Sequence, residues 1–68
     1  MTETIRLNGE PHRFIPGQTV AELLAALALD PNKIAVERNE AIVPRSLLAT
    51  TRLAPGDALE IVHFIGGG

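Results

Sequence analysis

The sequence contains no cysteine, no tryptophan and no tyrosine, and it has only two phenylalanines among its 68 residues. Without cysteine, the chain has no disulfide framework, no thiolate metal ligand and no thiol nucleophile. The longest purely apolar run, residues 23–29, is far shorter than a membrane-spanning helix. The first residues also lack the basic start and the apolar stretch of a signal peptide. We therefore expect a cytoplasmic protein.

Positive charge is scarce as well, since six basic residues stand against eight acidic ones and the formal net charge is −2. This balance provides no positive field for nucleic acid. A chain of 68 residues forms a single domain with a thin core. A deep enzyme pocket is not expected, because a wall of packed side chains around a substrate needs more chain than this.

Turn signals divide much of the sequence into short segments with strand character. Residues 4–7 alternate polar and apolar side chains, as a half-buried strand does. Asn8-Gly9 is a strong hairpin signal because both residues tolerate the positive φ of a tight turn. Further strands are expected at 12–15, 34–38, 41–43 and 59–65, with turns at Pro16-Gly17, near Asn39-Glu40 and at Pro55-Gly56-Asp57. Ser46 is expected to cap one short helical turn containing Leu47 and Leu48.

One amphipathic helix is predicted after the Pro16-Gly17 turn. Thr19 and Glu22 have the spacing of a capping box at its start. Apolar residues then recur at helical spacing and form one stripe, made of Val20, Leu23, Leu24 and Leu27. Asp30-Pro31 is predicted to end the segment, because the residue before a proline avoids helical φ and ψ.

The resulting order is two strands, a helix and three strands, which predicts an α+β fold of the β-grasp, ubiquitin-like type. A small mixed sheet packs against the single main helix, with the domain at residues 1–65 and a flexible glycine tail at 66–68. In the last strand, alternation places Leu59 and Ile61 toward the helix and Val62 and Phe64 on the open face. Our hypothesis is that Val62 and Phe64 form an apolar docking patch for partner enzymes.

The tail Gly66-Gly67-Gly68 has no side chains and a very thin cross-section. Such a terminus can thread a narrow channel and present its α-carboxylate to a reagent. A carboxylate is a poor acyl donor, but adenylation by ATP creates a good leaving group. A sulfur nucleophile then gives a thiocarboxylate at Gly68, and both ATP chemistry and sulfur must come from partners because this chain has no thiol.

Over nearly its whole length the sequence resembles the ThiS family of sulfur carrier proteins in thiamine biosynthesis. The resemblance rests on Leu7-Asn8-Gly9-Glu10, Thr19-Val20-Ala21-Glu22-Leu23-Leu24, Ala35-Val36-Glu37, Ile42-Val43-Pro44-Arg45, Pro55-Gly56-Asp57, Leu59-Glu60-Ile61-Val62 and Gly66-Gly67-Gly68. The chain departs from many members at Glu40, where a small turn residue is common, and at Leu47-Leu48, where a tryptophan often occurs.

The resemblance implies two partner enzymes and a sulfur donor. A ThiF-type adenylyltransferase activates the Gly68 carboxylate with Mg-ATP, and the persulfide of a cysteine desulfurase supplies the sulfur. A ThiG-type thiazole synthase then takes the sulfur into the thiazole ring, while Gly66 and Gly67 thread the partner active site. The chain itself binds no cofactor and no metal, and it has no catalytic residue.

Three other functions remain open from the sequence. The chain is alternatively a sulfur carrier of the molybdopterin-synthase small-subunit type, a ubiquitin-like protein modifier joined to lysines, or a non-covalent β-grasp interaction module. His12 and His63 have no clustered ligands beside them and are interpreted as structural or surface residues. Arg38 and Arg45 are interpreted as solvated surface charges.

Overall fold

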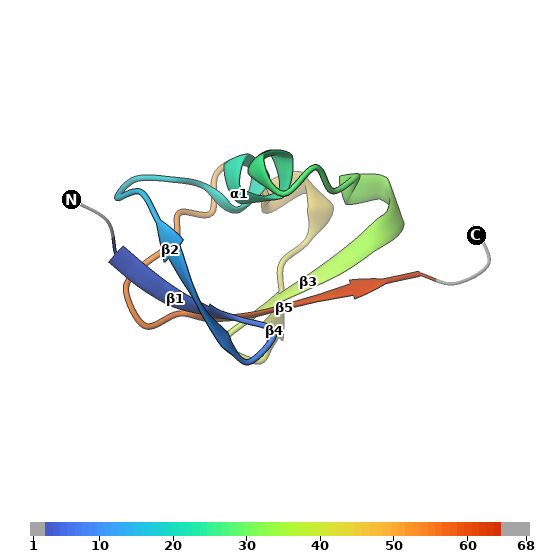
Figure 1. Ribbon diagram of the computed structural model, residues 1–68. Coiled ribbons are helices and arrows are strands. Elements are labelled where there is room, and N and C mark those ends of the chain that lie inside the picture. Colours follow the sequence, from blue (N-terminus) through green and yellow to red (C-terminus); the bar gives the residue numbers. More distant parts are fainter. Residues whose placement is uncertain (1–2, 65–68) are drawn as a thin grey trace.

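The computed structural model describes residues 3–64, which form a five-stranded mixed sheet with one α-helix on one face (Figure 1). The elements are β1 (Glu3–Leu7), β2 (Glu10–Phe14), α1 (Val20–Ala26), β3 (Ile34–Arg38), β4 (Ala41–Ile42) and β5 (Ala58–His63), with 3-10 turns η1 (Pro31–Lys33) and η2 (Arg45–Leu47). This order confirms the predicted α+β, β-grasp arrangement. The predicted strands also stand, although the second begins at Glu10 and ends at Phe14.

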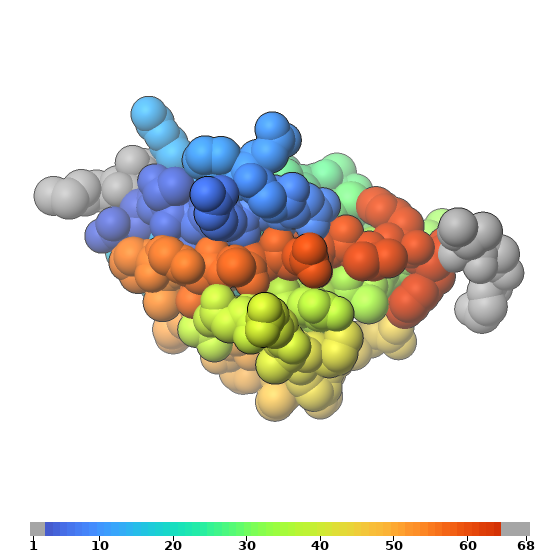
Figure 2. Space-filling view, turned by 90° about the horizontal axis from the view of Figure 1, so that it is seen from below, coloured from blue at the N-terminus to red at the C-terminus, as the bar shows by residue number. Residues whose placement is uncertain are grey.

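The last strand, β5, lies in the middle of the sheet, whose order is β2-β1-β5-β3-β4. It runs parallel to β1 and antiparallel to β3. Figure 2 views the sheet face that α1 leaves uncovered, with β5 between the β1–β2 pair on one side and the β3–β4 pair on the other. The last strand of the described chain therefore has a neighbouring strand on both sides.

Two tight turns join the outer strand pairs. Asn8 and Gly9 have φ values of 51° and 84°, and Asn39 and Glu40 have values of 53° and 72°. Both turns thus have positive φ at both central residues, as the hairpin predicted at Asn8-Gly9 requires. The turn predicted near Asn39-Glu40 proves to be of the same kind. Glu40 adopts this conformation without being glycine or asparagine, which costs about 1 kcal/mol or more of backbone strain.

The start of α1 confirms the predicted capping box. The Thr19 Oγ1 accepts a hydrogen bond from the Glu22 amide at 3.1 Å, and the Glu22 Oε1 accepts one from the Thr19 amide at 2.8 Å. These two bonds satisfy amide groups that the first helical turn leaves without partners. The N-terminus of the helix is therefore fixed by two side chains that the local sequence specifies.

The predicted end of the helix at Asp30-Pro31 is wrong, because α1 ends at Ala26. Ala28 takes a left-handed φ of 58°, its amide donates to the Ala25 carbonyl at 3.1 Å, and the Leu29 amide donates to the Leu24 carbonyl at 2.9 Å. These bonds form a Schellman motif, which usually places glycine where this chain has alanine. The turn also lets Leu29 pack back against the core.

The core lies between α1 and the sheet and is built from aliphatic residues and one phenylalanine. Its buried members are Ile5, Phe14, Val20, Leu23, Leu24, Ile34, Val36, Leu48, Leu53 and Leu59. Three of the four predicted stripe residues are buried, and Leu27 is half-buried against the same core. The predicted cap at Ser46 is wrong, because Ser46 lies inside η2 and the preceding Pro44 takes the cap position without a side-chain bond.

Candidate functional site

The open face of the sheet gathers apolar and acidic side chains across three strands. Val62 of β5 lies opposite Ala35 of β3, and Glu60 lies opposite Glu37, which in turn lies opposite Ile42 of β4. Side chains in register across neighbouring strands share one face. The alternate β5 residues Leu59 and Ile61 instead pack on the core side, where Leu59 is fully buried. Val62, Glu60 and the residues in register with them therefore face away from α1.

Val62 and Phe64 are exposed, as the alternation predicts, with 57% and 54% of their surface accessible. Ile42 joins them with 61% exposed, which the sequence analysis missed. Phe64 and Ile42 also line one groove together with Pro44 and Arg45, beside the edge of β3 that the short β4 leaves uncovered. We define the apolar patch as Ile42, Val62 and Phe64; its role in docking stays a prediction.

The C-terminal half of β5 is held from both sides. On the β3 side, the Phe64 amide donates to the Lys33 carbonyl at 3.0 Å. On the β1 side, the Asn8 Oδ1 accepts a hydrogen bond from the Ile61 amide at 2.8 Å. The strand is therefore paired up to Phe64, the last residue that the structure describes. The predicted attachment residue Gly68 and the threading residues Gly66 and Gly67 lie outside the described residues.

The start of β5 is fixed by the buried carboxylate of Asp57. It accepts hydrogen bonds from the Arg38 Nε and the Ala54 amide, both at 2.8 Å, and from the Asn39 Nδ2 at 3.1 Å. Burial alone raises the pKa of Asp57, but the hydrogen bonds from Arg38, Ala54 and Asn39 and the charge of Arg38 outweigh it and leave this pKa below its usual value.

The interpretation of Arg38 as a solvated surface charge is wrong, because Arg38 forms this salt bridge and is only one-third exposed. The local sequence does not predict this salt bridge, because Arg38 and Asp57 are 19 positions apart in the chain. Arg45 is exposed, as expected. The network ties the Pro55-Gly56-Asp57 turn to the end of β3, so it belongs to the support of the sheet.

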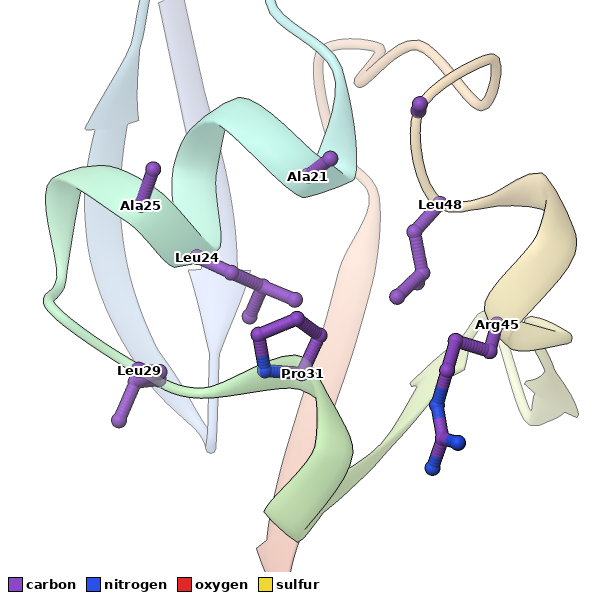
Figure 3. A pocket seen from close by; sticks show the side chains of 8 residues that line it. Ala21, Leu24, Ala25, Leu29, Pro31, Arg45 and Leu48 are labelled. Atoms are coloured by element: carbon purple, nitrogen blue, oxygen red, sulfur yellow. The ribbon is translucent and has the colours of Figure 1, made fainter.

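The two histidines lie apart on the sheet. His12 lies on β2 and His63 on β5, and within this range no three histidine, aspartate or glutamate residues gather as metal ligands. No helix in this part of the chain has the length and apolar character needed to cross a membrane. A depression on the helix side is lined by Leu24, Pro31 and Leu48, whose side chains converge there, with Arg45 as the charged lining residue (Figure 3).

Comparisons with known proteins give one consistent family. The sequence model of the ThiS family matches residues 5–68. The sulfur carrier protein ThiS of Bacillus subtilis is 35% identical over 65 residues, which cover 94% of this chain and 98% of that protein. A thiamine biosynthesis protein (ThiS) from Geobacter metallireducens has a crystal structure that superposes with a TM-score of 0.83 at 32% identity, covering 96% of this chain and 99% of that one.

The chain also matches a segment of two longer proteins that are named thiazole synthase. Thiazole synthases of Magnetococcus marinus and Paramagnetospirillum magneticum are 50% and 52% identical to this chain. The matches cover 94% and 91% of this chain but only 20% and 19% of those proteins. The chain thus spans about one fifth of their length.

Proposed function

The chain belongs to the ThiS family, and on this premise we propose that it is a sulfur carrier of thiamine biosynthesis that delivers sulfur as a thiocarboxylate on Gly68. The observation that carries the proposal is the match with a sulfur carrier protein over 94% of this chain and 98% of that protein. The family match includes the three terminal glycines. The chain acts as a co-substrate of its partners and is not an enzyme.

The proposed reaction begins with a ThiF-type adenylyltransferase. A Gly68 carboxylate oxygen attacks the α-phosphorus of Mg-ATP, pyrophosphate leaves, and an acyl-adenylate forms. The terminal sulfur of a desulfurase persulfide attacks the acyl carbon and expels AMP. A thiol then cleaves the resulting acyl disulfide, which releases the Gly68 thiocarboxylate and leaves a disulfide on the donor side. The absence of cysteine from this chain is consistent with a sulfur supply from outside.

The sulfur acceptor in this proposal is a ThiG-type thiazole synthase. The supporting finding is that two proteins named thiazole synthase contain a segment about half identical to this chain. A carrier segment in the same chain as a synthase is present at a high effective concentration, which favours transfer between the two. We propose that this chain delivers sulfur to the same kind of enzyme.

Docking is assigned in this proposal to the apolar patch of Ile42, Val62 and Phe64. Val62 and Phe64 lie toward the end of β5, and Ile42 of β4 lines the same groove as Phe64. A partner that covers the patch would therefore also meet the end of β5 that leads on to the glycines. Gly66 and Gly67 would then enter the partner's active site, where side chains would obstruct a narrow channel. Glu37 and Glu60 lie on the same sheet face and add polar contacts at the border of the patch.

The decisive experiment is the intact mass of the protein after incubation with the adenylyltransferase, Mg-ATP and a persulfide donor. We expect a gain equal to the replacement of one oxygen by sulfur, and no gain in a variant that lacks Gly68. Thiazole synthase should then restore the original mass. An unchanged mass with partners that modify another ThiS protein would overturn the proposal, and adducts on lysines of other proteins would indicate a protein modifier.

A further inference from the structure

Asn8 makes contacts that its role in a hairpin turn does not require. Its carboxamide meets both backbone groups of Ile61, which is 53 residues away: the Oδ1 accepts from the Ile61 amide at 2.8 Å, and the Nδ2 faces the Ile61 carbonyl at 3.4 Å. The Asn8 amide also donates to the Leu59 carbonyl at 2.8 Å. One turn residue therefore contacts the central strand at three backbone groups.

The geometry of the sheet explains why these contacts matter. β1 and β5 are paired only from Arg6 and Leu7 to Ala58 and Leu59, after which the chain turns away into the hairpin. The backbone of Ile61 faces this side, because the hydrogen bonds to β3 are made by its neighbours in the alternating antiparallel pattern. The Asn8 side chain thus makes the hydrogen bonds to Ile61 that the backbone of a longer β1 would make. It extends the pairing of β5 by one step.

We propose that Asn8 is a positioning residue for sulfur transfer: it fixes the direction in which β5 leaves the sheet toward the reactive terminus. This inference rests on the proposed function. Asn8 holds β5 on the β1 side, while Ala35 and Lys33 hold it on the β3 side. A strand held on one side only has more freedom at its end, and a reacting group that arrives in many orientations reacts more slowly.

A matched control exists in the second hairpin. Asn39 also occupies the first central position of its turn, with φ 53° against 51° for Asn8, and its Oδ1 also accepts a backbone hydrogen bond from β5, at 2.9 Å from the Ala58 amide. Asn39 acts at the start of β5 and Asn8 acts toward its end. The changes Asn8→Gly and Asn39→Gly both keep the positive φ accessible and both remove one carboxamide.

The test compares the two variants at a temperature where both are folded, by amide hydrogen exchange and by the rate of thiocarboxylate formation. We expect Asn8→Gly to accelerate exchange at Ile61 about tenfold beyond any global effect, as the loss of one or two hydrogen bonds implies. We expect it to lower kcat for transfer about tenfold, with little change in KM. Asn39→Gly should destabilise the fold but leave kcat within about twofold of the wild type.

The outcomes separate this inference from the function beneath it. An active wild type with equal kcat in Asn8→Gly and Asn39→Gly overturns the positioning role and leaves the sulfur carrier intact. A wild type that forms no thiocarboxylate overturns both. Asn8→Asp provides a second variant, because it keeps the acceptor for the Ile61 amide and loses the donor. It should transfer faster than Asn8→Gly, and a slower rate would contradict the proposal.

Discussion

Replacement of Phe64 by aspartate is the most direct test of the apolar patch. About half of a phenylalanine surface of roughly 200 Å² is accessible at this position, since 54% is exposed. Burial of about 100 Å² of apolar surface against a partner stabilises a complex by up to about 2.5 kcal/mol. Phe64→Asp removes this contribution and places a charge in the interface. The lost burial alone corresponds to a weakening of up to about 60-fold, and we expect binding to the adenylyltransferase to weaken by roughly this factor.

The assay is isothermal titration calorimetry, which measures the affinity of each partner for the wild type and for the variant. Ile15→Asp is the control, because Ile15 is also exposed, at 65%, but follows β2 outside the patch. The fold should survive both changes, since neither side chain belongs to the core, and circular dichroism checks this. Equal affinities for Phe64→Asp and Ile15→Asp would refute the assignment of docking to this face.

Two further predictions concern stability. Ala28→Gly should raise the free energy of unfolding by about 0.5–1 kcal/mol, because glycine adopts the left-handed φ of 58° without strain, and denaturant titration measures this gain. Asp57→Asn should lower the melting temperature by about 10 °C at pH 7. Because the pKa of Asp57 is lowered in the folded protein, its stabilisation is present above about pH 4 and lost as the pH falls below that. Thermal melts from pH 7 to pH 3 should show the two proteins converging, and a constant difference would contradict the assigned role.

Local patterns predicted the parts of the fold that short stretches of chain determine. The capping box of Thr19 and Glu22 lies within four residues, and the Asn8-Gly9 turn depends on the φ preferences of two adjacent residues. Alternation in the last strand also placed Val62 on the exposed face. In each case the physical cause and the sequence signal occupy the same few positions.

The helix end and the exposed Ile42 were not predicted because they depend on tertiary packing, which adjacent residues do not determine. The helix ends at Ala26 because Ala28 accepts a strained φ, which lets Leu29 return to the core. Tertiary burial outweighs about 1 kcal/mol of backbone strain here, and the glycine that normally marks such an end is absent. Ile42 was not predicted as part of the patch for the same reason. Its place beside Phe64 depends on where β4 pairs in the sheet and not on its own neighbours in sequence.

The candidate site combines both kinds of information, which explains why only part of it was predictable. The patch residues on β5 follow from alternation, but the support of that strand comes from side chains that reach across the fold: Asn8 bonds to Ile61 over 53 residues, and Arg38 bonds to Asp57 over 19. An asparagine in a turn satisfies its local role whether or not its carboxamide finds a distant partner. The sequence signal at Asn8 therefore predicts the turn but not the contact with Ile61. That contact follows from the parallel pairing of β1 with β5.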